Sequence, residues 1–300
     1  MKIISWNTRG LNGAHKEELV RNMIRDQRPN FLLIQETNTK RELVSKLSFS
    51  KFMNIDATDS EGVSRGVLML YNKRVYKMSP IYNANNALLC KVAHIHSDDT
   101  WFILNLYAPN SKRERKALWA KISAVITINN IDKRIIMGDL NFPLTDGEKY
   151  GGLTPDQESK LDLSNFIHNL AFMDFDLLGG RFTWSNRRIG GECIQIHLDR
   201  AFISPRWLQS HFCRLSLLPK VGLDHSPISL FVFPLTFKRT FPFHFEKMWI
   251  THPTLETKIS SWWNIEVEGT AMYKVAQKLK NVKRNIKIWN KFDFGHIFSG

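Results

Sequence analysis

The stretch Arg134-Ile135-Ile136-Met137-Gly138-Asp139-Leu140-Asn141 joins a short apolar run to an acid and an amide. Such a run is typical of a strand buried on both faces that ends at the rim of a sheet. The glycine before the acid leaves room for close backbone approach. Alternation along an extended chain places Asp139 and Asn141 on one face, where they can orient a water and hold a phosphoryl oxygen. The alternative is an Asx-type turn after a buried strand.

Four other polar motifs follow apolar runs elsewhere in the chain. They are Ser5-Trp6-Asn7, Leu33-Ile34-Gln35-Glu36, Leu106-Tyr107-Ala108-Pro109 and Leu223-Asp224-His225. Strand ends deliver side chains to the loops where functional groups gather. Acid, amide, phenol and imidazole together suit a hard cation and a phosphate ester. The five motifs therefore predict one composite site, although each motif taken singly also reads as an ordinary strand end or turn.

Carboxylates and an imidazole are the candidate metal-binding and proton-transfer groups. Glu36 is presented by a rigid strand and is a candidate Mg²⁺ ligand, and Asn7 can hold Glu36 or a metal-bound water. Asp224 and His225 face opposite ways on a strand, so Asp224 can approach the metal while His225 reaches the phosphate. Asp199 is a candidate partner of the imidazole, because a neighbouring carboxylate favours the protonated form.

Further candidates have weaker local support. The phenol of Tyr107 can hydrogen-bond a phosphate or simply pack at the rim of the sheet. Arg187 and Arg188 lie in residues 186–191, the expected loop of a hairpin, and can enter a DNA groove or form a solvated turn.

Composition indicates a globular protein with an anionic partner. The 300 residues are 43% hydrophobic, and the net charge is +14. A polyanion is the simplest partner for such a charge, and a generally basic surface is the alternative. No apolar run reaches the roughly 18 residues of a membrane span. A strand is expected directly after Met1, which leaves no room for a secretion signal. Three scattered cysteines indicate reduced thiols in a cytosolic or nuclear protein.

The pattern of strands and helices predicts an α/β (α+β) fold in which two mixed β-sheets pack face to face as a sandwich flanked by helices. Helices are expected over 16–27, after Ser111 and from Thr154-Pro155. The expected strands are 2–6, 31–35, 66–71, 87–95, 101–106, 134–137, 181–185, 193–202, 212–217 and 227–233. Alternation within 193–202 predicts that Gln195, His197 and Asp199 share a face.

The chain changes character after residue 234. Residues 235–300 contain 11 Lys and Arg against 5 Asp and Glu. Apolar residues from Met272 to Trp289 recur at steps of three and four, which predicts an amphipathic helix with a narrow seam. We expect a domain at 1–234 followed by a basic, partly helical tail at 235–300. The tail is either docked on its own domain or a linker to a further domain.

Taken together, the motifs resemble the DNase I/exonuclease III/inositol-phosphatase superfamily of metal-dependent phosphoesterases, and most closely the endonuclease domain of non-LTR (LINE-type) retrotransposons. The similar segments are Ser5–Asn12, Leu32–Thr37, Gly138–Asn141, Arg181–Asn186 and Leu198–Arg200. In the tail, Phe243–Trp249 and Trp289–Gly295 resemble the segment that leads to the reverse transcriptase of these elements. The sequence departs from the family pattern at Leu223, where the family has serine, and at Ile196-His197, where it has Glu-Arg.

The resemblance implies a DNase I-like fold and a role for each motif. Mg²⁺, or Mn²⁺ in its place, would be held by Asn7, Glu36 and Asp224. The scissile phosphate would be held by Tyr107 and Asn141. Asp139 would orient the attacking water or assist the leaving group, and His225 paired with Asp199 would stabilise or protonate phosphate oxygens. Thr183 matches a position near the DNA backbone.

The function implied is Mg²⁺-dependent nicking of double-stranded DNA, leaving a 3′-hydroxyl that primes reverse transcription of the element's RNA. We expect a nuclear protein with a cytoplasmic ribonucleoprotein stage, bound to that RNA through downstream domains. Two alternatives stay open. One is a phosphatase or other phosphodiesterase that acts on a small molecule or lipid, and the other is a decayed, non-catalytic nucleic-acid-binding relic.

Overall fold

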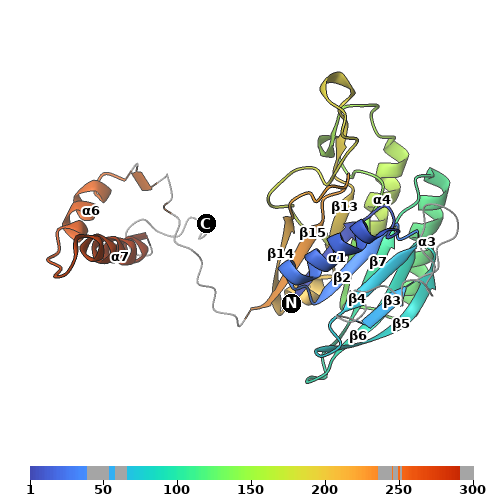
Figure 1. Cartoon of the computed structure of the whole chain (residues 1–300), viewed down its shortest axis with the longest axis horizontal. Coiled ribbons are helices and arrows are strands. Elements are labelled where there is room, and N and C mark those ends of the chain that lie inside the picture. The colour runs from blue at the N-terminus through green and yellow to red at the C-terminus, as the bar shows by residue number, and fades with distance from the viewer. Residues whose placement is uncertain (39–53, 58–65, 236–244, 246–248, 251, 291–300) are drawn as a thin grey trace. The chain divides into compact units, whose positions relative to one another are not determined.

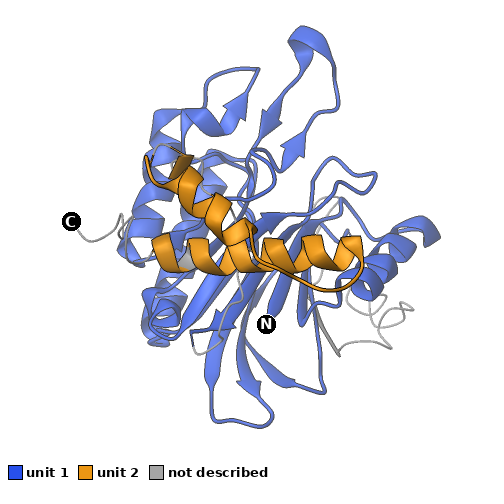
Figure 2. Ribbon diagram, turned by 90° about the vertical axis from the view of Figure 1, so that its left-hand side faces the viewer, with its two compact units in different colours: residues 1–237 blue, residues 238–300 orange. Residues whose placement is uncertain are grey.

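A computed structural model describes residues 1–38, 54–57, 66–235, 245, 249–250 and 252–290 (Figure 1). The chain divides into two compact units, Met1–Phe237 and Lys238–Gly300, which are coloured separately in Figure 2. Each unit is described by itself below. No helix within the described ranges is long and apolar enough to cross a bilayer.

Two mixed sheets form the first unit, as predicted. The first sheet has the strand order β14 (His211–Leu217), β15 (Ile228–Pro234), β1 (Lys2–Asn7), β2 (Phe31–Gln35), β4 (Val67–Tyr71) and β3 (Asn54–Ala57). The second has the order β10 (Met173–Asp174), β13 (Asp199–Ile203), β8 (Arg134–Asp139), β7 (Thr100–Tyr107), β6 (Ala87–His94) and β5 (Tyr76–Ala84). The central pairs β1–β2 and β7–β8 are parallel, and the other pairs in these sheets are antiparallel.

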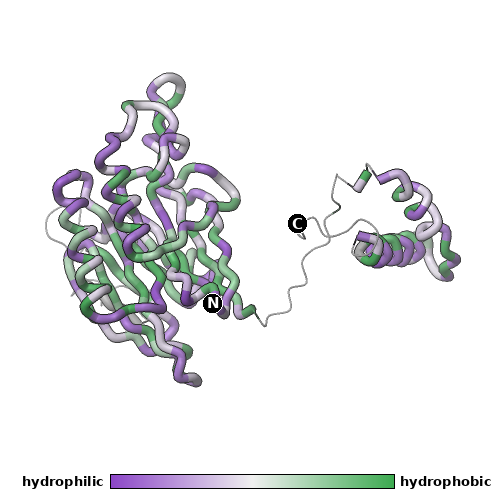
Figure 3. The backbone as a smooth tube through the Cα atoms, turned by 180° about the vertical axis from the view of Figure 1, so that it is seen from behind, coloured by the Kyte–Doolittle hydropathy of each residue, from purple (hydrophilic) through white to green (hydrophobic). Residues whose placement is uncertain are grey.

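Apolar side chains from both sheets fill the space between them. Leu33 and Met69 of the first sheet belong to the same buried cluster as Ile103 and Met137 of the second. This burial explains why the central strands read as nearly continuous apolar runs. In Figure 3 the hydrophobic colours concentrate on the strands of the sandwich and the hydrophilic colours on its loops.

Helices cover the outer faces of the sandwich. Helix α1 (Ala14–Gln27) packs through Val20 onto the cluster that contains the first sheet. Helices α3 (Lys112–Ile128) and α4 (Gln157–Asn169) cover the second sheet, where the rings of Trp119 and Phe166 lie 4.8 Å apart. Helix α4 begins after Asp156 rather than at Thr154-Pro155, because the Asp156 carboxylate accepts the Ser159 N–H at 2.9 Å and caps the helix.

Two of the expected strands are shorter than predicted. The stretch 181–185 pairs only at β11 (Trp184–Ser185), and 193–202 divides into β12 (Gln195–Ile196) and β13. Together with β9 (Lys149–Tyr150), β11 and β12 form a small third sheet, and the predicted hairpin across 186–191 is confirmed. The strand breaks because the backbone N–H groups of Leu198 and Asp199 both donate to the Thr183 hydroxyl, at 3.0 Å each.

The three cysteines are free thiols in the structure. Cys90 and Cys213 are buried in the sandwich, and Cys193 is half-buried. Burial raises the pKa of the Cys213 thiol to about 12, which keeps it protonated and unreactive.

The second unit contains α6 (Leu255–Trp263) and α7 (Ala271–Trp289). Leu255, Ile286 and Trp289 form a small core with Trp249. The predicted apolar seam of α7 is therefore buried only toward the C-terminal end of the helix. At the other end Met272 is 80% exposed. Parts of the two segments that resemble a path to a reverse transcriptase, residues 243–244, 246–248 and 291–295, lie outside the described residues.

Candidate active site

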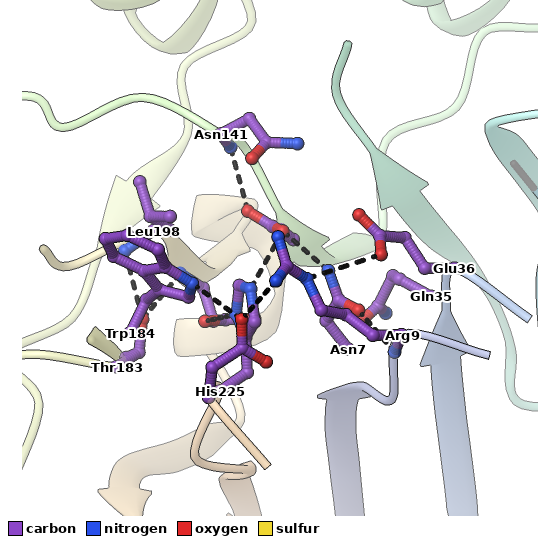
Figure 4. A network of polar contacts seen from close by, with 12 residues as sticks. Asn7, Arg9, Gln35, Glu36, Asn141, Thr183, Trp184, Leu198 and His225 are labelled. Atoms are coloured by element: carbon purple, nitrogen blue, oxygen red, sulfur yellow. Dashed lines mark hydrogen bonds and ion pairs between the residues drawn. The ribbon is translucent and has the colours of Figure 1, made fainter. Parts of the chain in front are cut away.

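The predicted polar motifs meet at one edge of the sandwich because parallel neighbours end together. Asn7 at the end of β1 lies beside Gln35 at the end of β2. Tyr107 at the end of β7 lies beside Asp139 at the end of β8, and Asp199 at the start of β13 pairs with Asp139 from the other side. Figure 4 shows this network from close by.

A buried polar bridge holds the two sheets in register beneath the site. The Gln35 amide donates to the Ser5 hydroxyl at 3.0 Å and to the Asn105 side chain at 2.6 Å. Asn105 in turn donates to the backbone oxygens of Ile34 and Leu68, at 3.0 Å each. Glu36 follows Gln35, and Tyr107 lies two residues after Asn105. The bridge between Gln35 and Asn105 therefore fixes the distance between Glu36 and Tyr107.

Asp139 is completely buried at the centre of the site. Its Oδ2 accepts from the Asn7 amide at 2.8 Å and lies 3.7 Å from Nε2 of His225. Gly138 makes this position possible, since a Cβ there would lie 1.8 Å from the Leu106 oxygen. Asn7 thus orients Asp139, and its expected contact with Glu36, a metal ion or a metal-bound water stays a prediction.

The backbone after Asp139 turns and does not continue as an extended strand. Asn141 adopts a left-handed conformation with φ 51°, and its N–H donates to Oδ1 of Asp139 at 2.9 Å. The same-face argument from strand alternation is therefore wrong, and the Asx-type turn is correct. The turn still directs the Asn141 side chain to the site, where its amide donates to the Ala108 oxygen at 2.6 Å.

His225 lies between two buried carboxylates. Its Nδ1 is 2.9 Å from Oδ2 of Asp199, so the predicted pairing is present. One side-chain oxygen or nitrogen atom from each of Asp139, Asp199 and His225 lies within 4.8 Å of the other two. Burial alone would lower the pKa of His225, but the carboxylates, led by Asp199 and then Asp139, outweigh it and raise the pKa to about 9.

The pKa of the Asp139 carboxyl is higher than that of an ordinary solvent-exposed aspartate. Burial raises it to about 6, against the opposing effects of His225 and the bonds from Asn141 and Asn7. At neutral pH the pair is therefore a carboxylate beside an imidazolium. One group can accept a proton and the other can donate one, which is the arrangement that general acid–base chemistry requires.

Thr183 supports Asp199 from behind. It is 1% exposed, and its hydroxyl accepts the backbone N–H of Asp199 and of Leu198. The hydroxyl therefore positions Asp199 and Leu198. The match of Thr183 to a position near a DNA backbone stays a prediction. The expected common face of His197 and Asp199 is also lost, because the strand breaks between them and His197 lies beside Glu148 and Arg200.

Glu36 and Tyr107 form a second pair. Glu36 has φ 51° and is 8% exposed, and its carboxylate accepts a hydrogen bond from the Tyr107 phenol. Burial and the adjacent carboxylate raise the pKa of the phenol far above its usual range, so it stays protonated. Tyr107 was expected to hold a phosphate, and in the structure its hydroxyl holds Glu36.

Arg9 is the main site residue that the sequence reasoning missed. Its guanidinium lies 2.8 Å from Oδ2 of Asp224 and 3.8 Å from Oε2 of Glu36, and Figure 4 shows it reaching across the site. Trp184 donates to the same Asp224 oxygen at 3.0 Å. The one available signal was a cation two residues after Asn7. Lys16 holds this loop by donating to the backbone oxygens of Thr8 and Arg9.

This arrangement tests whether the predicted ligands suit a metal ion. Glu36 and Asp224 both lie beside the Arg9 guanidinium. Their carboxylates therefore converge on a position where positive charge is favourable. Carboxylate oxygens on two sides of this position match the preference of Mg²⁺ and Mn²⁺ for hard oxygen donors. The residues therefore fit a divalent cation.

A cleft gives access to these groups. It has a volume of about 360 Å³ and is lined by Glu36, Asn141 and His225, with Phe142 and Leu198 as apolar walls. A second hollow of about 570 Å³ adjoins it through Arg9 and Trp184. This hollow is lined by the following charged and polar residues: Asn186, Arg187, Arg188 and the acidic Asp224. The structure thus places the two hairpin arginines beside the site, and their contact with DNA stays a prediction.

Leu223, the departure from the family pattern, does not point a polar group at this site. Its side chain is partly buried, packs against the core of the sandwich and also lines the second hollow. The leucine thus contributes apolar contact at a position where the resembling sequences carry a hydroxyl.

Comparison with known families shows the family of the chain. The pattern of the endonuclease/exonuclease/phosphatase family matches residues 4–220, a range that includes Asp139 and Asp199 and ends shortly before Asp224 and His225. The chain belongs to this family. Its members' fold is the face-to-face sandwich seen here, and the family description covers hydrolysis of phosphoesters. The comparison with curated proteins gives no match.

Solved structures with this family fold include several nucleases. The endonuclease domain of TRAS1, a telomere-specific non-LTR retrotransposon, is 15% identical with a TM-score of 0.59, covering 79% of this chain and 99% of that one. The AP endonuclease LMAP from Leishmania major is 15% identical with a TM-score of 0.63, covering 78% and 87%. The 3′-5′ exonuclease NExo from Neisseria meningitidis is 15% identical with a TM-score of 0.59, covering 78% and 100%. At this identity the likeness shows the fold.

Proposed function

We propose that the chain is a Mg²⁺-dependent endonuclease that nicks one strand of double-stranded DNA and leaves a 3′-hydroxyl. In a non-LTR retroelement this end would prime reverse transcription of the element's RNA in the nucleus. The observation that carries the proposal is the buried Asp139–His225–Asp199 cluster opening onto a cleft with an arginine rim. The motif resemblance and the fold shared with the TRAS1 endonuclease domain support it.

Each side chain has a definite task in this reaction. The Asp139 carboxylate, held by Asn7 and the Asn141 N–H, accepts the proton of the attacking water. The His225 imidazolium, held by Asp199, donates to a phosphate oxygen as negative charge develops.

The remaining groups bind the cation and the substrate. Glu36 and Asp224 would hold the divalent cation, which when bound neutralises charge on the reacting phosphate. Tyr107 keeps Glu36 oriented. Asn141 faces the cleft and can hold the phosphate, while Arg187 and Arg188 contact the DNA backbone from the hairpin.

Nicking of supercoiled plasmid tests the function directly. The purified protein should relax the plasmid with Mg²⁺, stop with EDTA and leave ends that a DNA polymerase extends without prior phosphatase treatment. DNA affinity should fall steeply with salt, because arginine and lysine contacts to phosphate release counterions.

Hydrolysis of small phosphomonoesters without nicking would favour the phosphatase alternative. Binding without any hydrolysis would favour the decayed relic.

The nicking rate should depend on pH as a bell-shaped curve. Below about pH 6 the Asp139 carboxyl is protonated and cannot accept a proton, and above about pH 9 His225 loses the proton it donates. The two limits belong to the coupled pair. They are measured as kcat/KM between pH 5 and 10 at saturating Mg²⁺.

A variant tests the alkaline limb of this curve. Asp199→Asn removes the carboxylate that contributes most to raising the pKa of His225, so the alkaline limit should move to lower pH. The acid limit should move in the same direction, because Asp199 also raises the pKa of Asp139. An alkaline limit that is unchanged in Asp199→Asn would contradict this assignment of His225.

A chain that ends at Phe237 should remain folded and keep its nicking activity. The groups assigned to chemistry lie before residue 226, and β15 ends at Pro234. The cut removes 11 Lys and Arg and 5 Asp and Glu, a net +6. Thermal melts and plasmid nicking on both lengths check this. Collapse of the shortened chain would show that the tail belongs to the core of the first unit.

A further inference from the structure

The second unit contains a cleft that the nicking reaction does not use. It has a volume of about 690 Å³ and lies between α7 and the segment that follows α6. The volume falls within the range of ordinary ligand pockets, so a flexible chain can enter it.

One wall of the cleft is built by an alternating segment. Ile265 and Val267 line it and are half-buried, whereas the intervening Glu266 and the following Glu268 are exposed and are not among its lining residues. Asn281 of α7 fixes the opposite wall by donating its amide to the backbone oxygen of Trp262 at 2.7 Å. The pairing of wall and helix is thus specified by hydrogen bonding as well as by packing.

Tyr273 stands at one end of the cleft with an accessible ring. It is 52% exposed, although its ring is held from one side by Gly269. A Cβ at Gly269 would lie 2.9 Å from the ring, and its φ of +124° also favours glycine. The chain reversal at Gly269 therefore places the backbone against the tyrosine and leaves the rest of the ring open for stacking.

The charged groups that line the cleft are all cationic. They are Lys280, Lys283 and Arg284, and α7 contains no acidic residue from Ala271 to Trp289. Gln277 also lines the cleft, and its amide has no hydrogen-bond partner within the part of the chain that the structure describes. Clustered cations, an open aromatic ring and a free amide form a surface for a polyanion that carries planar groups.

Single-stranded nucleic acid has this chemistry. Strand-binding proteins combine a positive groove for the backbone with aromatic rings on which bases stack. A concave cleft suits an extended strand better than a duplex, whose grooves receive projecting helices or strands. The free Gln277 amide can also pair with a 2′-hydroxyl, the group by which proteins distinguish RNA from DNA.

We propose that this cleft binds a single strand of RNA, with a base stacked on Tyr273 and backbone phosphates on Lys280, Lys283 and Arg284. The proposal concerns binding by the second unit and does not depend on the nicking reaction. It therefore stands or falls separately from the proposed endonuclease activity.

Fluorescence anisotropy on the full chain tests it, with a labelled 12-nucleotide oligo(U) in EDTA. Tyr273→Ala should weaken binding about 10-fold or more, the effect of losing one stacked base. Tyr273→Phe keeps the ring and should bind as the wild type does. The double variant Lys280→Gln/Arg284→Gln should weaken binding and reduce the salt slope by about 1.4, since each phosphate contact to a single strand contributes about 0.7.

Lys274→Gln and Met272→Ala are matched controls, because both residues are exposed on the same helix and do not line the cleft. They should change affinity less than about 2-fold, and melting curves confirm that each variant folds. Equal binding of oligo(dT) overturns the assignment to RNA, and equal, Tyr273-dependent binding of a duplex overturns the assignment to a single strand. Undiminished oligo(U) affinity in Tyr273→Ala, or in a chain ending at Phe237, overturns the site itself.

Discussion

Replacing Asp139 with asparagine should lower the rate of plasmid nicking at least ~100-fold, the lower end expected for a general acid–base group. The substitution keeps the size of the side chain but removes the charge that accepts the water proton. It also places an amide in a fully buried position whose neighbours, the Asn7 amide at 2.8 Å and the His225 ring, both present donors. His225→Ala should cause a loss of the same order, because it removes the imidazolium.

The two losses should not add. Residues that act as one unit lose most of their joint effect when either is removed, so the double variant should be about as slow as the slower single variant. Asp162→Asn is a matched control, since this aspartate lies on α4, outside the site. Its carboxylate pairs with the Lys116 ammonium at 3.5 Å. Initial rates at saturating Mg²⁺ are compared after circular dichroism has shown that all variants fold. Wild-type rates in Asp139→Asn would rule out the mechanism.

Arg200→Met should destabilise the first unit by about 3–5 kcal/mol, the usual cost of removing one partner from a buried ion pair. Arg200 is 2% exposed, and its guanidinium contacts the carboxylates of Glu148 and Asp174. Methionine fills a similar volume but leaves both carboxylates partly buried without their cation. A loss of this size should lower the melting temperature by roughly 6–20 °C.

A surface arginine provides the control for this effect. Arg206 lies 3.7 Å from Asp132, and both side chains are mainly exposed, so Arg206→Met should cost about 0–1 kcal/mol. Adding Glu148→Gln and Asp174→Asn to Arg200→Met should recover part of the lost stability, since the unpaired charges disappear. If the single variant melts with the wild type, the ion pairs contribute nothing to the fold.

Local pattern was sufficient for much of the architecture. The central strands of the sandwich have both faces buried, so β2 and β8 appear in the sequence as uninterrupted apolar runs. The edge strand β5 was not predicted, because its burial is irregular and a bulge interrupts its pairing between Pro80 and Tyr82. An edge strand takes its pairing from a neighbour, and its own residues carry little periodicity.

Contacts between distant segments decided what the pattern could not. Thr183 breaks the strand around His197 because its hydroxyl takes two N–H groups that a ladder would otherwise use. The place of Arg9 depends on Asp224, more than two hundred residues later in the chain. Neither relation has a local signature, since single residues of these types occur in many loops.

The sequence by itself therefore determined the sandwich and indicated the candidate site groups, since several of them lie at the ends of buried strands that meet at one edge of a sheet. Only the tertiary structure decided how these groups pair. Asn7 and the Asx turn orient Asp139, Tyr107 holds Glu36, and Arg9 joins the two predicted metal-binding carboxylates. Pairing depends on distances of a few ångströms between elements that are far apart in the chain, and alternation along a strand does not encode such distances.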